Sequence, residues 1–288
     1  MSPEGWAGGW LLGLAVLSMV YCIRLARNSD YDWWESCLYL PTYLFGRLLW
    51  RVHFTNVAPA ELRSGAVLAA NHRSSVDPFF VQLAARRRVH WMVAKEYCQH
   101  FAFGPLLRAL QVIPTNRSGM DTASTKTALR LTHAGRLVGM FPEGRINQTE
   151  STLLPLRGGA ALVAIRTGVP MIPLWIEGSP LGRSVWSPVL MPARVTITFG
   201  EPLWPEGGSG TNAVAQSSIA GTKSNADREL SPELGTVTET AQKADKNRDA
   251  LAASDELIVQ WGRQIMALAG RAGTPIELAS QRKNRNRS

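Results

Sequence analysis

A histidine and an aspartate, His72 and Asp77, follow an apolar run and could act together as a general base. The run Val67–Ala70 is typical of a buried strand, and side chains that follow strands in α/β proteins lie at the edge where ligands bind. Five positions separate the two residues, so they cannot share a regular helical face, but a turn can bring the carboxylate to the imidazole. Such a carboxylate fixes the tautomer of the histidine and raises the basicity of its outer nitrogen. Because no serine in a G-x-S-x-G setting accompanies the pair, this base would act directly on a substrate hydroxyl.

Each of these residues also has a purely structural interpretation. Asp77 is followed by Pro78 and an apolar helix-like segment. An aspartate at the N-cap with a proline at the first helical position is a strong helix start, so Asp77 could simply cap that helix. His72 could likewise be a turn residue whose ring is bonded within the protein.

A second group of polar residues follows the apolar run Leu137–Phe141. Pro142 opens a turn that contains Glu143, Gly144 and Arg145. If the two runs are parallel strands of one sheet, this turn lies at the same edge as His72. The structural alternative is a tight turn with an ion pair on the surface.

Arg117 follows a short strand-like segment and a proline. A planar guanidinium suits a pair of phosphate oxygens, so Arg117 is a candidate ligand for a phosphate group. The structural alternative is an arginine that is solvated and binds nothing.

The composition favours an anionic lipid surface as a partner. The formal net charge is +9, which attracts polyanions, and the 10 tryptophans suit a membrane–water interface. The chain has no zinc-finger or RNA-binding signature, so we expect no nucleic acid partner. Three cysteines without CxxC spacing favour reduced thiols and a reducing compartment. The sequence contains no cluster of histidines and cysteines of the kind that would predict a metal site.

The N-terminal region contains an uncharged apolar run, Trp6–Ile23, which is near the lower length limit for a membrane-spanning helix. Arg24 and Arg27 follow it, and the positive-inside rule then predicts that the rest of the chain faces the cytoplasm from the inner membrane. A cleaved signal peptide and a buried core helix are the alternatives. A second apolar stretch, Leu38–Trp50, is too short to span and is predicted to be interfacial or re-entrant.

The centre of the chain alternates short apolar runs with helix-like segments, which predicts an α/β domain with a mostly parallel central sheet flanked by helices. The expected strands are Val67–Ala70, Val89–Ala94, Gln111–Pro114, Leu137–Phe141, Met171–Ile176 and Val195–Phe199. The expected helices are Pro78–Arg87, Asp121–Ala134 and Arg157–Thr167.

The remaining segments complete the predicted organisation. A stretch rich in Gly, Ser and Thr without apolar periodicity indicates disorder, and helical periodicity resumes at Leu251–Leu268. We therefore predict a membrane-anchoring helical segment at residues 1–50, the main domain at 51–205, a disordered insertion at 206–250, a helix closing the domain at 251–272 and a basic tail at 273–288.

Four blocks of this sequence, in order, resemble those of the PlsC-like glycerophospholipid acyltransferases. That family's first block is Asn-His-x-x-x-x-Asp, the HX4D motif, and it is complete here as Asn71, His72 and Asp77. Its second block ends in an arginine after a strand, matched by Arg117. The resemblance covers roughly residues 52–203.

The third block departs from the family's common form, and the fourth matches it. The family has Phe-Pro-Glu-Gly-Thr-Arg-Ser, whereas here Phe141–Gly144 is followed directly by Arg145, without the threonine. The resulting Glu-Gly-Arg-Ile is similar to acyltransferase domains that act on lysophosphatidylethanolamine. The fourth block, Val-Pro-x-x-Pro, is present as Val169, Pro170 and Pro173.

The resemblance implies an acyltransferase that moves a fatty acyl group from acyl-CoA or acyl carrier protein to the free hydroxyl of a lysophospholipid. The implied acceptor is 1-acyl-sn-glycerol-3-phosphate, with lysophosphatidylethanolamine or a lyso-aminolipid as alternatives. A non-catalytic lipid-binding protein on the same fold is the alternative from another class. The implied catalytic residues are His72 and Asp77, no cofactor or metal is expected, and the implied substrate-binding residues are Asn71, Arg117, Glu143, Gly144 and Arg145.

Overall fold

The structure of the chain is a computed structural model. It describes residues 33–101, 104–116, 122–182, 186–205 and 235–280, together with residues 13, 16, 17, 19, 20, 23, 24, 27, 31 and 184.

The described chain forms a seven-stranded sheet with the order β1-β7-β6-β2-β5-β3-β4. The strands are β1 (His53–Phe54), β2 (Ala66–Ala70), β3 (Val89–Ala94), β4 (Ile113–Thr115), β5 (Leu137–Met140), β6 (Met171–Glu177) and β7 (Thr196–Phe199). The α-helices are α2 (Trp33–Leu48), α3 (Asp77–Ala85), α4 (Lys95–Gln99), α5 (Gly104–Ala109), α6 (Thr122–His133), α7 (Gly159–Thr167) and α8 (Gly235–Leu268), and the 3-10 helices are η1 (Ala60–Arg63) and η2 (Ser187–Leu190).

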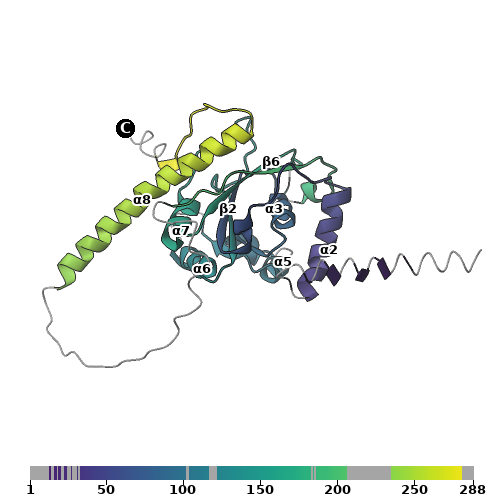
Figure 1. Cartoon of the computed structure of the whole chain (residues 1–288), viewed down its shortest axis with the longest axis horizontal. Helices are drawn as coiled ribbons and strands as arrows, with labels where there is room; N and C mark the ends of the chain where they lie inside the picture. The colour runs from purple at the N-terminus through teal and green to yellow at the C-terminus, as the bar shows by residue number, and fades with distance from the viewer. Residues whose placement is uncertain are drawn as a thin grey trace, which may run out of the picture.

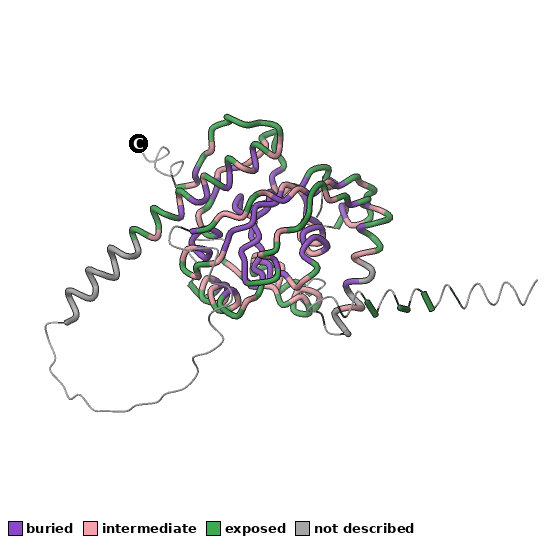
Figure 2. Tube along the Cα trace, viewed as in Figure 1, coloured by how far each residue is buried: buried purple, intermediate pink, exposed green. Residues whose placement is uncertain are grey.

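Helices cover both faces of the sheet (Figure 1), and the alternation of side chains along the central strand β2 explains why. Leu68 points into a core that includes α2 and α3, whereas Val67 and Ala69 point into a core that includes α7 and α8. All five residues of β2 are buried, and the centre of the sheet is the most buried part of the tube in Figure 2. An apolar run buried on both faces is what a central parallel strand requires.

The expected α/β architecture is confirmed, but the sheet is mixed. Each of the six predicted strands overlaps an observed strand, and five of the six strand pairings are parallel. The exception is the antiparallel pair β6–β7. Parallel neighbours need a crossover connection, usually a helix. The segment between β6 and β7 contains no α-helix among its described residues, only η2, and β7 returns beside β6 in the opposite direction.

The interfacial segment predicted at Leu38–Trp50 forms most of helix α2, which continues through Pro41. Tyr39 and Trp50 are buried in the core shared with α3, so this part of the predicted anchor region belongs to the main domain. Leu44, Phe45 and Leu48 are exposed. Most of the predicted anchor Trp6–Ile23 lies outside the described residues, and within the described part of the chain we find no helix with both the length and the apolar character needed to span a bilayer.

Helix α8 begins earlier than the sequence predicted. It starts at Gly235, so the last part of the expected disordered insertion at 206–250 is helical, while residues 206–234 lie outside the described residues. The early turns of α8 lack the apolar periodicity by which a sequence indicates a packed helix. The later turns pack against the sheet: Trp261 is fully buried, and its Nε1 donates to the Ala69 carbonyl of β2 at 3.0 Å.

Candidate active site

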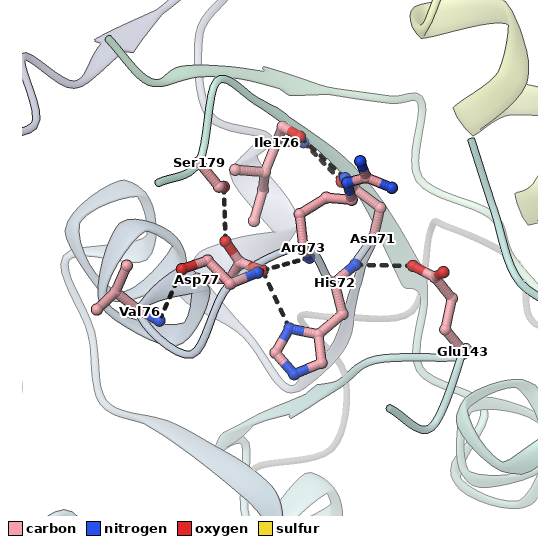
Figure 3. Close-up of polar contacts among 9 residues, drawn as sticks. Asn71, His72, Arg73, Val76, Asp77, Glu143, Ile176 and Ser179 are labelled. Atoms are coloured by element: carbon pink, nitrogen blue, oxygen red, sulfur yellow. Dashed lines mark hydrogen bonds and ion pairs between the residues drawn. The ribbon is translucent and has the colours of Figure 1, made fainter. Parts of the chain in front are cut away.

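His72 lies at the carboxyl edge of the sheet, two residues beyond the end of β2. Its Nδ1 is 3.0 Å from Oδ2 of Asp77, so the neutral ring places its proton on Nδ1 and leaves Nε2 as the acceptor. Nε2 points away from Asp77 (Figure 3), and the side chain of His72 is 14% exposed. The predicted His–Asp pair is therefore formed, and its basic nitrogen faces outward.

Asp77 holds the turn between the two residues rather than capping the helix. Its Oδ2 also accepts the backbone N–H groups of Arg73 and Ser74, each at 2.7 Å. Asp77 is the first residue of α3, and the N-cap position is Val76, which makes no side-chain cap bond. The N-cap interpretation of Asp77 is wrong, because its carboxylate turns back toward the histidine and accepts from residues that precede the helix.

Asn71 does not face a ligand, contrary to the substrate-binding role implied by the sequence. It is fully buried, its Nδ2 donates to the Ile176 carbonyl at 2.9 Å, and its Oδ1 accepts the Ile176 N–H at 2.7 Å. The side-chain amide thus continues the pairing of β2 with β6 beyond the last strand residue. Asn71 fixes the point at which the chain leaves the sheet to present His72.

The ring of His72 is held by stacking as well as by hydrogen bonding. Phe141 stacks on it with ring centroids 3.8 Å apart and planes 9° apart. Trp91 of β3 stacks on the other side of Phe141, with centroids 4.7 Å apart. A Cβ at Gly139 would lie 2.7 Å from the indole of Trp91, so glycine leaves the space that this stack occupies. Three neighbouring strands therefore contribute to the orientation of one imidazole.

Glu143 supports the backbone of His72 and is not positioned to bind a substrate. Its carboxylate is buried, with Oε1 accepting the His72 N–H at 2.8 Å and Oε2 accepting the Leu154 N–H at 2.9 Å. Burial raises the pKa of the Glu143 carboxyl, against the lowering effect of these two N–H donors. On the opposite side, the Asn147 N–H donates to the His72 carbonyl at 2.7 Å. The third block therefore clamps both backbone polar groups of the histidine.

The turn after β5 places Gly144 and Arg145 at the surface. Gly144 has φ +69°, and its N–H donates to the Phe141 carbonyl. A Cβ at this position would lie 2.9 Å from Nε of Arg157, so both the backbone conformation and the space favour glycine. The tight turn was predicted, but its ion pair is not formed: of these two described residues, Glu143 is buried in the clamp and Arg145 is exposed. Arg117 lies outside the described residues.

Replacing Glu143 with glutamine tests the clamp. The carboxamide retains one acceptor and turns its NH2 toward the other backbone N–H, which leaves buried donors unpaired at a cost of about 1–3 kcal/mol. We expect a lower Tm and a lower kcat, with the KM of the acceptor changed less than twofold. Glu150→Gln, an exposed position on the same segment, is the matched control. A raised acceptor KM at an unchanged Tm would restore the substrate-binding role.

One residue near the pair was missed by the sequence reasoning. Ser179 lies two residues after β6, and its hydroxyl donates to Oδ1 of Asp77 at 2.6 Å (Figure 3). A signal for it existed, because β6 runs parallel to β2 and a polar residue that follows it reaches the same edge. The pattern of the fourth block ends at Pro173, within β6, and does not extend to Ser179.

Comparison with known proteins agrees with this site. The family model described as Acyltransferase matches residues 51–177, a range that begins before β1 and contains both His72 and Glu143. Over this range, which is less than half of its length, the chain is similar to acyltransferases.

Two relatives of this chain are named 1-acyl-sn-glycerol-3-phosphate acyltransferases. The 1-acyl-sn-glycerol-3-phosphate acyltransferase of Bacillus subtilis (strain 168) is 28% identical over 146 residues, which cover 50% of this chain and 69% of the relative. The enzyme of the same name from Limnanthes douglasii is 28% identical over 141 residues, and the chain spans about half of its length. The crystal structure of the 1-acyl-sn-glycerophosphate acyltransferase PlsC from Thermotoga maritima aligns with a TM-score of 0.47 and 20% identity, over 72% of this chain and 81% of that one.

Proposed function

We propose that this protein transfers a fatty acyl group from acyl-CoA or acyl carrier protein to the free hydroxyl of 1-acyl-sn-glycerol-3-phosphate, which gives phosphatidic acid. The observation that carries the proposal is the His72–Asp77 pair, whose basic Nε2 faces outward. Among the described residues, no side chain forms a hydrogen bond with Nε2, which leaves this nitrogen available to a substrate hydroxyl. The relatives named above supply the acceptor class.

The proposed reaction has two steps. Nε2 of His72 removes the proton of the acceptor hydroxyl while the oxygen attacks the thioester carbonyl of the donor, and Asp77 stabilises the imidazolium that forms. The tetrahedral intermediate then expels the thiolate, which takes the proton from His72. A positioned base contributes roughly 10²–10⁴-fold, and holding two substrates together contributes much of the remainder. The acylated acceptor and the free thiol of the donor are the products, and no covalent link to the protein forms in either step.

A panel of acceptors tests this proposal. The purified full-length chain in detergent micelles is supplied with radiolabelled acyl-CoA or acyl carrier protein and with 1-acyl-sn-glycerol-3-phosphate, lysophosphatidylethanolamine or a lyso-aminolipid. We expect the highest kcat/KM with the first acceptor. Transfer only to one of the others would reassign the acceptor. Absence of transfer to all of them, at a level equal to that of His72→Ala, would favour the lipid-binding alternative.

The altered third block keeps lysophosphatidylethanolamine as the second candidate acceptor. The missing threonine brings Arg145 directly after Gly144, and its side chain is exposed beside the turn that supports His72. A shift of one residue in a short turn changes where a guanidinium can meet a headgroup. The acceptor panel distinguishes the two, because only one of them carries an ethanolamine on the phosphate.

We further propose that Arg145 binds the acceptor phosphate, together with Arg117. The loss of one charge-assisted hydrogen bond corresponds to roughly a 10- to 100-fold change in affinity. We expect Arg145→Ala to raise the acceptor KM by about this factor and the donor KM by less than twofold, and Arg145→Lys to recover part of the loss, since an ammonium cannot form the fork. Arg130→Ala, an exposed arginine on α6 before β5, removes the same charge at the opposite edge and should leave both constants unchanged. Equal effects of Arg145→Ala on both substrates would contradict this role.

We propose that the protein acts at the cytoplasmic face of the inner membrane. The apolar run Trp6–Ile23, the following Arg24 and Arg27, and the net charge of +9 support this location. The exposed Leu44 and Leu48 on α2 add apolar surface to the region that follows the run. Protease added outside intact cells should leave the main domain uncut, and digestion of that domain would contradict the orientation.

A further inference from the structure

We propose that Ser179 is a positioning residue of the acyl transfer, whose hydroxyl fixes the plane of the Asp77 carboxylate and thereby holds the ring of His72. The proposal rests on the proposed function of the His72–Asp77 pair. Ser179 lies beyond the fourth sequence block and comes from a different part of the fold, 102 positions away from Asp77. Ser179, Asp77 and His72 would then form a chain of three hydrogen-bonded side chains, which we call the relay.

The hydrogen bonds of Asp77 divide between its two oxygens. Oδ2 accepts from Nδ1 of His72 and from the backbone of Arg73 and Ser74. Those three donors fix the position of Oδ2. The rotation of an aspartate carboxylate about its last side-chain bond is only weakly restricted, so a second hydrogen bond is needed to fix the carboxylate plane. The Ser179 hydroxyl provides it at Oδ1, at a distance of 2.6 Å (Figure 3).

The backbone after β6 is shaped to deliver this hydroxyl. Gly178, which precedes Ser179, has φ +77°. A Cβ there would collide with the carbonyl oxygen of Arg194, in the segment that leads into β7. The chain therefore turns tightly against its neighbour as it leaves β6, and this turn directs Ser179 toward α3.

Because Asp77 is buried, loss of the Ser179 contact should be costly. The side chain of Asp77 has no exposed surface, so water does not replace a lost donor without a rearrangement. A hydrogen bond of 2.6 Å between a hydroxyl and a carboxylate is in the short, charge-assisted range. Removal of the hydroxyl leaves Oδ1 of Asp77 without this donor and should loosen the carboxylate that holds the ring of His72.

The test compares Ser179→Ala, Ser179→Thr and the control Ser64→Ala, an exposed serine before β2 at the opposite edge. We expect Ser179→Ala to lower kcat roughly 10- to 100-fold, the equivalent of one charge-assisted hydrogen bond, with both KM values within twofold of the wild type. Ser179→Thr keeps a hydroxyl and should recover most of the rate. Ser64→Ala should match the wild type. A kcat for Ser179→Ala equal to that of the wild type, or a threonine variant as impaired as the alanine variant, would overturn the proposal.

A second measurement separates this proposal from the proposed function. NMR spectra of the His72 ring nitrogens in the wild type, Ser179→Ala and Ser64→Ala proteins require no turnover. The chemical shift of Nδ1 reports on its hydrogen bond with Asp77, so we expect it to change in Ser179→Ala alone. Identical spectra in all three proteins would overturn the positioning role even if acyl transfer is found. A changed spectrum in a protein without acyl transfer would support the relay and contradict the proposed function.

Discussion

His72→Ala is expected to lower kcat for acyl transfer by roughly 10²–10⁴-fold, because the substitution removes the base that accepts the proton of the acceptor hydroxyl. The KM values for donor and acceptor should change little, since Nε2 is used in the chemical step rather than in holding a phosphate. The measurement is steady-state kinetics with radiolabelled donor, on protein whose fold is checked by thermal unfolding.

The controls for this variant come from the stack and from the surface. Loss of the ring removes the 3.8 Å contact with Phe141, so a small fall in Tm is expected and the assay is run well below it. His133→Ala changes an exposed histidine at the end of α6 and should be fully active. If His72→Ala kept more than about a tenth of the wild-type rate, the general-base role would be untenable.

Asp77→Asn is the second substitution with a large expected effect. Asparagine can place Oδ1 where it accepts from His72, Arg73 and Ser74, and its NH2 can donate to the Ser179 hydroxyl, which is able to accept. The fold should therefore survive, whereas the negative charge that stabilises the imidazolium is lost. We expect kcat to fall by roughly 10²–10⁴-fold with Tm within a few degrees of the wild type.

Asp77→Ala is the useful companion to Asp77→Asn. Alanine leaves the backbone donors of Arg73 and Ser74 without the carboxylate, so both activity and Tm should fall. A fully active Asp77→Asn enzyme would show that the aspartate only shapes the turn. An equal fall in Tm in both variants would show that the site does not accommodate asparagine. The role of the Asp77 charge would then be tested by the pH dependence of kcat/KM in the wild type.

The elements nearest the site were largely predictable, since they depend on local patterns. The runs that became β2 and β5 are continuous and apolar, as strands buried on both faces must be, and a turn with polar residues follows each run. Because parallel strands end at one edge, the sequence alone brought His72 and Glu143 to the same place. The antiparallel return of β7 and the early start of α8 were not predictable in this way, because neither leaves a periodic signal.

The sequence by itself determined where the strands end and that a short turn can bring an aspartate to the histidine, because strand ends and short turns are set by residues close together in the chain. Only the tertiary structure decided what each polar group does. The orientation of a buried side chain depends on donors and acceptors from distant segments, and these assigned Asn71 to the backbone of β6, Glu143 to the backbone of His72, and Ser179 to the free oxygen of Asp77. A buried polar group takes whichever partner the fold brings within bonding distance, since leaving it unpaired costs more than any local preference of the chain.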